Sequence, residues 1–90
     1  MNYHFEKHIN IVKRYEVTHI KPLMPYQELV QIRQKQKTPT KCFMCENHFN
    51  DNDMIFLGFM KGKVNNQLFC AACAANIKST LDEQYTLINH

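Results

Sequence analysis

Apolar and polar residues alternate along the first part of the chain. Between Asn2 and Lys21 the polar residues fall mainly on even positions, and the large apolar residues fall mainly on odd ones: Tyr3, Phe5, Ile9, Ile11, Tyr15 and Val17. A period of two residues predicts strands or a hairpin with one buried face, and the β-branched residues of the stretch agree. A helix in which Phe5, Ile9 and Val12 share one face remains the alternative. No turn signal places a hairpin.

Pro22 and Pro25 interrupt this alternation, and a different period follows them. A short amphipathic helix is predicted from about Pro25 to Gln36, because proline suits a first helical turn and the apolar residues then recur at helical spacing. These apolar residues are Tyr26, Leu29, Val30 and Ile32. Residues 38–40, Thr-Pro-Thr, are expected to link this segment to the next.

The second half of the chain reads as a hairpin followed by a helix. The apolar run Met54–Met60 predicts one strand and Gln67–Phe69 another, with Gly and Asn between them as turn material. A helix is predicted from Cys70 to about Ile88, with an apolar stripe at Ile77, Leu81, Tyr85 and Ile88. Met54–Met60 is more apolar than a small hairpin needs. We therefore expect it to be covered by the N-terminal segment or by a partner.

Four cysteines, arranged as two C-x-x-C pairs, dominate the chemistry of the chain. Cys42 and Cys45 form the first pair, Cys70 and Cys73 form the second, and 24 residues separate the pairs. Two such pairs offer four thiolates to one tetrahedral ion, so we expect these residues to bind one structural Zn²⁺. A small domain of 90 residues buries a modest core and is commonly stabilised in this way.

Other uses of the cysteines fit the sequence less well. A disulfide framework needs an oxidising compartment, and residues 1–7 do not resemble a signal peptide. Covalent haem needs a histidine directly after a pair, where this chain has Glu46 and Ala74. A thioredoxin-like site would use only one pair. Iron or an iron–sulfur cluster remains an alternative to zinc.

The chain has, in this order, a loop with the first cysteine pair (a zinc knuckle), a hairpin, and a second cysteine pair at the start of a helix. This order resembles the treble-clef zinc fingers, over residues 41–85. The fold class that we expect is therefore α+β, with an N-terminal strand or hairpin and short helix in residues 1–37 and a Cys₄ treble-clef module in residues 38–90. The segment 65–78 is also similar to the closing part of HNH-type nucleases, but no histidine lies between His48 and His90 to serve as their catalytic base. We expect no enzymatic activity.

The charge of the chain gives little support for nucleic-acid binding by itself. The formal charge is +3, and a Zn²⁺ with four thiolates would reduce it to +1. Phosphate contacts must therefore come from local clusters, with Phe43 or Phe49 available to stack on bases. The candidates flank the first pair and the hairpin tip: Arg33, Lys35, Lys37, Lys41, Lys61 and Lys63.

Three other polar residues are weaker candidates for binding a metal. His48 has a permissible spacing for a zinc ligand but is more simply a turn residue. Asp51 and Asp53 would make a weak site for a hard cation and suit a turn better.

These observations lead to one functional hypothesis and two alternatives. We expect a non-enzymatic, cytoplasmic adaptor that docks on a larger protein of the replication, transcription or mobile-element machinery and adds contacts to DNA or RNA. No apolar run is long enough to span a membrane, and no small-molecule substrate is expected. The first alternative is a protein–protein module or inhibitor without nucleic-acid binding. A more remote one is an HNH-like nuclease.

Overall fold

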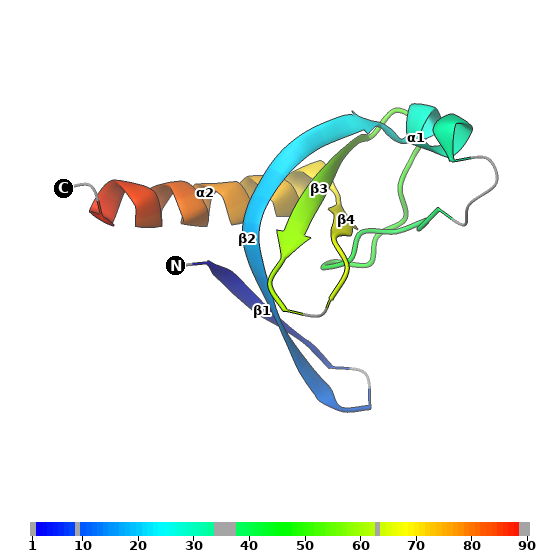
Figure 1. Cartoon of the computed structure of the whole chain (residues 1–90). Coiled ribbons are helices and arrows are strands. Elements are labelled where there is room, and N and C mark those ends of the chain that lie inside the picture. Colours follow the sequence, from blue (N-terminus) through cyan, green and yellow to red (C-terminus); the bar gives the residue numbers. More distant parts are fainter. Residues whose placement is uncertain (1, 9, 34–37, 63, 89–90) are drawn as a thin grey trace.

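The computed structural model describes residues 2–8, 10–33, 38–62 and 64–88. Within them the chain is a small α+β domain, as predicted, with an antiparallel sheet of strand order β1-β2-β3-β4 (Figure 1). The elements in chain order are β1 (Tyr3–His8), β2 (Val12–Pro25), α1 (Tyr26–Ile32), β3 (Met54–Met60), β4 (Gln67–Phe69) and α2 (Ala71–Ile88).

The N-terminal alternation forms strands and not a helix. β1 pairs antiparallel with the first part of β2, with Phe5 opposite Tyr15 and Lys7 opposite Lys13. Side chains along β1 alternate between half-buried and exposed, which is the predicted period of two. The prediction that Ile11 faces the core is wrong, because the hairpin turns there and leaves Ile11 66% exposed. Ile9 lies outside the described residues.

β2 is long and strongly curved, and its two halves pair with different strands (Figure 1). Val17 joins the two ladders: it pairs with Tyr3 of β1 and with Met60 of β3, and it is fully buried. The register shifts directly after it, where the Thr18 hydroxyl donates a hydrogen bond of 3.1 Å to the carbonyl of Phe59. Such an irregularity increases the bend of a strand.

The prediction that the strand ends before Pro22 is wrong. β2 continues to Pro25, with Pro22 opposite Phe56 and Pro25 opposite Met54. Proline is tolerated here because this half of β2 is paired on one side, with β3, while β1 pairs with the other half. A second register shift, between Pro22 and Met24, also relieves the demand for a regular ladder.

Helix α1 is shorter than the predicted Pro25–Gln36, and residues 34–37 lie outside the described part. No side chain caps its start. Instead the backbone N–H of Tyr26 donates to the carbonyl of Asp53, and that of Gln27 donates to the carbonyl of Asp51. These two bonds satisfy donors that a helix cannot satisfy internally. Leu29 is buried as predicted, but Val30 and Ile32 are exposed.

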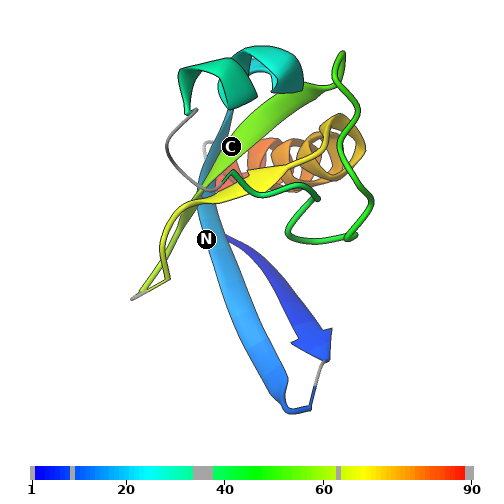
Figure 2. The same cartoon turned by 90° about the vertical axis from the view of Figure 1, so that its right-hand side faces the viewer.

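The core lies where helix α2 packs on the sheet (Figures 1 and 2). Its fully buried side chains include Val17 of β2, Ile55 of β3, Phe69 of β4 and Ile77 of α2. Strand β3 lies inside the sheet, between β2 and β4, so both of its edges are paired, one of them with the N-terminal segment. Of the predicted α2 stripe, Ile77 is buried and Leu81 is half-buried. Tyr85 and Ile88 lie outside the described side chains.

Residues 1–37 and 38–90, which were predicted as separate parts, contribute strands to one sheet through the β2–β3 pairing. Within the described residues, no helix combines the length and the apolar character that a bilayer crossing requires.

Candidate metal centre

The first cysteine pair lies in a tight loop that the backbone closes on itself. Lys41 and His48 form an antiparallel bridge at its base. Inside the loop, the N–H of Cys42 donates to the carbonyl of Asn47, and the N–H of Glu46 donates to the carbonyl of Cys42. Glu46 has φ = 64°, in the left-handed region that non-glycine residues seldom adopt. This turn brings the Cys42 and Cys45 side chains to the same side.

The second pair lies at the junction of β4 and α2, as predicted. Cys70 directly follows β4, and its carbonyl accepts the N–H of Ala74, so it stands at the start of the helix. Cys73 lies in the first turn of α2. The N–H of Phe43, in the first loop, donates to the carbonyl of Leu68 in β4. This bond holds the loop of the first pair against the strand that leads to the second.

The four sulfurs are brought together. Their Sγ atoms all lie within 4.8 Å of one another, and the Sγ atoms of Cys45 and Cys70 are 3.7 Å apart. Zinc–thiolate bonds of about 2.3 Å place the corners of a tetrahedron about 3.8 Å apart. The four cysteines are free thiols, and their spacing fits one tetrahedral ion. Cys42, Cys45, Cys70 and Cys73 can therefore bind a metal ion.

The surroundings of the sulfurs are unequal. Cys42 and Cys73 are buried, Cys70 is half-buried and Cys45 is exposed. Burial raises the pKa of Cys42, but N–H groups of Cys45, Cys70 and Met44 directed at its sulfur lower it by more, so the pKa falls below its usual value. Burial raises the pKa of both Cys70 and Cys73. A bound dication would ionise all four sulfurs, since coordinated thiols lose their protons.

The other metal-ligand candidates do not join this cluster. Among the described residues, the four cysteines are the one group of three or more potential ligands close enough to share an ion. His48 is exposed in its bridge with Lys41. The Asp53 carboxylate accepts a 2.8 Å hydrogen bond from the N–H of Asn50, which is the predicted turn role.

The N-terminal hairpin packs on the loop of the first cysteine pair, a contact that the sequence pattern did not reveal. The ring of Phe43 lies 4.8 Å from that of Tyr15, 5.9 Å from that of Phe5 and 6.1 Å from that of Phe69, between ring centroids. The Lys7 ammonium lies 4.1 Å from the Phe43 ring centroid and 3.6 Å from a Glu46 carboxylate oxygen. The cysteine cluster is therefore braced from outside its own half of the chain.

This packing changes the expected role of two aromatic residues. Phe49 is buried, with its ring 5.2 Å from that of Tyr26, and so cannot stack on a base. One face of Phe43 is occupied by Lys7. The sequence could not exclude these roles, because both depend on contacts between distant segments.

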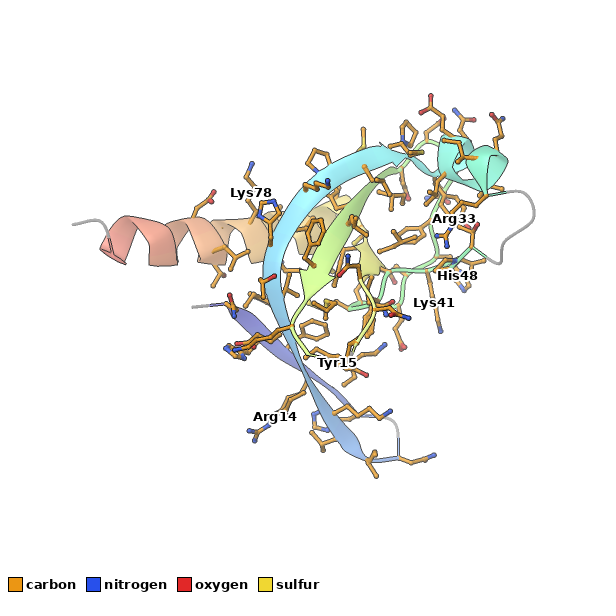
Figure 3. The ribbon with its side chains drawn as sticks, viewed as in Figure 1. Arg14, Tyr15, Arg33, Lys41, His48 and Lys78 are labelled. Atoms are coloured by element: carbon orange, nitrogen blue, oxygen red, sulfur yellow. The ribbon has the colours of Figure 1, made fainter. Side chains whose placement is uncertain are left out.

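Three of the six predicted phosphate-contacting residues lie in the described part of the chain. Figure 3 shows Arg33 below α1, and Lys41 farther from that helix, on the segment that leads into the loop of the first cysteine pair. Lys61 instead lies at the end of β3, 3.6 Å from a Glu16 carboxylate oxygen. The pKa of Glu16 is lowered, chiefly by a hydrogen bond from the Asn2 side chain and further by Lys61. Lys35, Lys37 and Lys63 lie outside the described residues.

An open groove of about 460 Å³ lies along residues 38–43, beside β4, and Lys7 is the hairpin residue that lines it. Lys7 and Lys41 contribute cationic groups to it, and Glu46 contributes a carboxylate. Its lining also includes Thr40, Phe43 and Gln67.

No protein-family model matches this chain, and no curated protein or solved structure is significantly similar to it. Its function must therefore be argued from its own residues.

Proposed function

We propose that the protein is a non-enzymatic adaptor, stabilised by one structural Zn²⁺, that docks on a larger protein of nucleic-acid machinery and contributes contacts to DNA or RNA. The observation that carries the structural role is the closed set of four clustered sulfurs. Four thiolates fill a tetrahedral zinc site and leave no position for water or substrate, which is the property of structural zinc.

The arrangement of elements supports a treble-clef interpretation of this site. The loop of Cys42 and Cys45 is followed by the β3–β4 hairpin, and α2 begins beside Cys70. In that arrangement one ion joins the loop, the hairpin and the helix. Removal of the ion is then expected to remove the fold, because binding energy in such sites is folding energy.

The nucleic-acid contacts are proposed for the basic residues that flank the first cysteine pair and the tip of the β3–β4 hairpin. Arg33, Lys41 and Lys61 are the described members of this set, and Lys41 lines the groove together with Lys7. Lys61 is the weakest described member because its charge is offset by Glu16. The proposed set in full is Arg33, Lys35, Lys37, Lys41, Lys61 and Lys63.

Two surfaces are proposed for docking on the larger protein. The outer edge of β1 is one, since β1 is the terminal strand of the sheet and an edge strand can accept a partner strand. The other is the β3–β4 hairpin, whose Met54 is exposed at the start of β3. The alternative, a protein-binding module without nucleic-acid contacts, would use the same two surfaces.

Salt-dependent binding of labelled oligonucleotides tests the function. Micromolar or tighter binding, with affinity falling steeply as salt increases, supports nucleic-acid contact. The substitutions Arg33→Gln and Lys41→Gln should each weaken it. An absence of binding, together with a stable protein complex, supports the protein-binding alternative. Plasmid cleavage with Mg²⁺ or Mn²⁺ would instead support a nuclease.

A further inference from the structure

The β1–β2 hairpin extends away from the rest of the molecule (Figures 1 and 2). Its near half is held to the loop of the first cysteine pair by Phe5, Lys7 and Tyr15. Its far end, which we call the arm tip, consists of His8 and residues 10–14. Ile11 and Val12 of the arm tip are 66% and 55% exposed, so they contribute little to the core.

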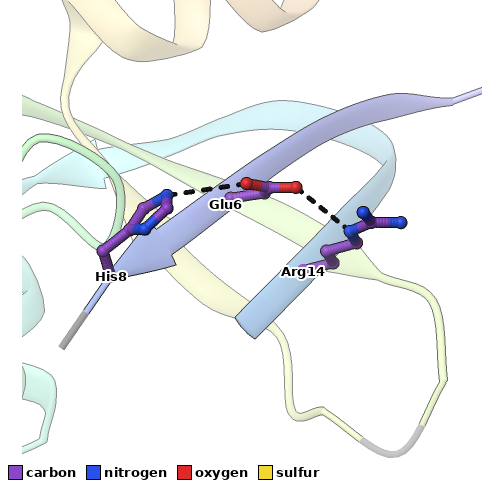
Figure 4. A network of polar contacts seen from close by, with 3 residues as sticks. All are labelled: Glu6, His8 and Arg14. Carbon is purple, nitrogen blue, oxygen red and sulfur yellow. Dashed lines mark hydrogen bonds and ion pairs between the residues drawn. The ribbon is translucent and has the colours of Figure 1, made fainter. Parts of the chain in front are cut away.

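The charges of the arm tip suit a polyanion. It contains Lys13 and Arg14, both exposed, and no carboxylate. The nearest acidic group on the hairpin is Glu6, which accepts a 3.0 Å hydrogen bond from Arg14 Nε and lies 3.5 Å from His8 Nε2 (Figure 4). The terminal nitrogens of Arg14 point away from Glu6, and the side chain is 85% exposed. Arg14 can therefore contact a phosphate while Glu6 fixes its position.

Exposed apolar groups next to these cations restrict the kind of polyanion. Ile11 and Val12 lie nearer the turn of the hairpin than Lys13 and Arg14 do, and a site that contacts phosphates alone has no use for two exposed branched side chains there. The major groove of B-DNA offers both partners: phosphates along its rims and thymine methyl groups on its floor. The deep, narrow major groove of duplex RNA does not admit side chains in this way.

The dimensions of the arm tip agree with that groove. The major groove is about 12 Å wide and admits a two-stranded β-ribbon, whereas the minor groove, about 6 Å wide, does not. The first three residues of β2, from Val12 to Arg14, extend about 10 Å, which is close to the groove depth of about 8.5 Å.

We propose that the arm tip enters the major groove of duplex DNA, with Lys13 and Arg14 on the phosphates and with Ile11 and Val12 against thymine methyl groups. This inference rests on the proposed nucleic-acid function and assigns the contact to a surface outside the basic set of Arg33 to Lys63.

The first experiment measures binding of the zinc-loaded protein to a fluorescent 20-base-pair duplex over a range of salt concentrations. Lys13→Gln and Arg14→Gln should each lower the affinity several-fold and reduce the salt slope by about 1. Lys78→Gln is the matched control, because it removes the same charge from an exposed position on α2 (Figure 3). Zinc content and circular dichroism verify that every variant is folded.

The second experiment replaces thymine by uracil in the same duplex. Each methyl group that Ile11 or Val12 covers should be worth roughly fourfold in affinity. The double variant Ile11→Ser and Val12→Ser should bind both duplexes equally, because it has lost the apolar contact. A minor-groove ligand added as competitor should not displace the wild-type protein.

The outcomes separate this inference from the function on which it rests. If the wild-type protein binds RNA or single-stranded DNA but no duplex DNA, the inference alone is overturned. If it binds no nucleic acid, both are overturned, and binding to anionic vesicles in that case would make the arm tip a membrane contact. If Lys13→Gln and Arg14→Gln bind like Lys78→Gln, the proposed contact between the arm tip and DNA is overturned, while Arg33 and Lys41 remain candidates for binding nucleic acid. If uracil has no effect on the wild-type protein, insertion into the major groove is overturned.

Discussion

Among single residues, Gly58 is notable because the ring of Phe69 occupies the space that a side chain at position 58 would need. A Cβ atom at Gly58 would lie 2.4 Å from Cε2 of Phe69, which is fully buried and packs against Phe5 and Phe43. The ring cannot move without disturbing these contacts, so Gly58→Ala should destabilise the protein by about 1–3 kcal/mol. Chemical denaturation measures the loss. Adding Phe69→Leu should reduce the further cost of Gly58→Ala. Full additivity of the two changes would contradict the clash.

Glu46 has an unfavourable backbone conformation that its neighbours maintain. Its φ of 64° suits asparagine and disfavours β-branched residues. Glu46→Asn and Glu46→Val both remove the ion pair with Lys7. The difference between them therefore reports on the backbone alone. We expect the valine variant to be less stable than the asparagine variant by about 1–2 kcal/mol in thermal or chemical denaturation. Equal stabilities would show that the loop adopts a different conformation.

At the scale of elements, the aromatic contacts of the N-terminal hairpin join it to the loop of the first cysteine pair. Phe5 lies between Tyr15, Phe43 and Phe69, with ring centroids 5.5–6.3 Å away. Phe5→Ala should therefore cost about 2–3 kcal/mol, less than a fully buried phenylalanine, and should speed the loss of the metal to a chelator. Stopped-flow measurement with a coloured chelator tests this. Ile11→Ala, at the exposed end of the same hairpin, is the control and should change neither quantity.

The elements that the sequence predicted well are those with local signals. The apolar run Met54–Met60 and the segment Gln67–Phe69 became β3 and β4 with the predicted bounds, and Ala-rich sequence after Cys70 became α2. The cysteine spacing identified the four clustered sulfurs. For the strands and the helix, a pattern within a few residues determines the local structure. For the cysteines, the shared chemistry of two C-x-x-C pairs predicted the contact between distant segments.

The features that escaped sequence analysis depend on which distant segments meet. The strand β2 passes through Pro22 because that half pairs with β3 on one side, a fact that no local pattern contains. The packing of Phe5 and Tyr15 on Phe43 likewise joins residues more than 25 positions apart. The turn between β1 and β2 has no glycine signal, and so its position came from the structure.

For the whole molecule, one sheet and one cluster of four cysteines imply a single cooperative unit. β2 pairs with β3, and the N-terminal hairpin packs on the loop of the first cysteine pair. Chelation of the metal should therefore expose β1 and β2 as well as the C-terminal half. Amide hydrogen exchange of Phe5 and Val17, before and after chelation, measures this. Continued protection of these amides in the metal-free protein would show that the two halves fold independently.

The central claim is that one zinc ion, held by four cysteines, stabilises the whole fold. Structural zinc contributes about 10–16 kcal/mol, which is as large as the total stability of a typical domain of about 5–15 kcal/mol. The most direct test is native mass spectrometry with elemental analysis, followed by circular dichroism during chelation. We expect one zinc per chain in the wild-type protein and in His48→Ala, loss of the ion in Cys42→Ser, and loss of structure with the ion. Iron in place of zinc, or a metal-free protein that remains folded, would contradict the account.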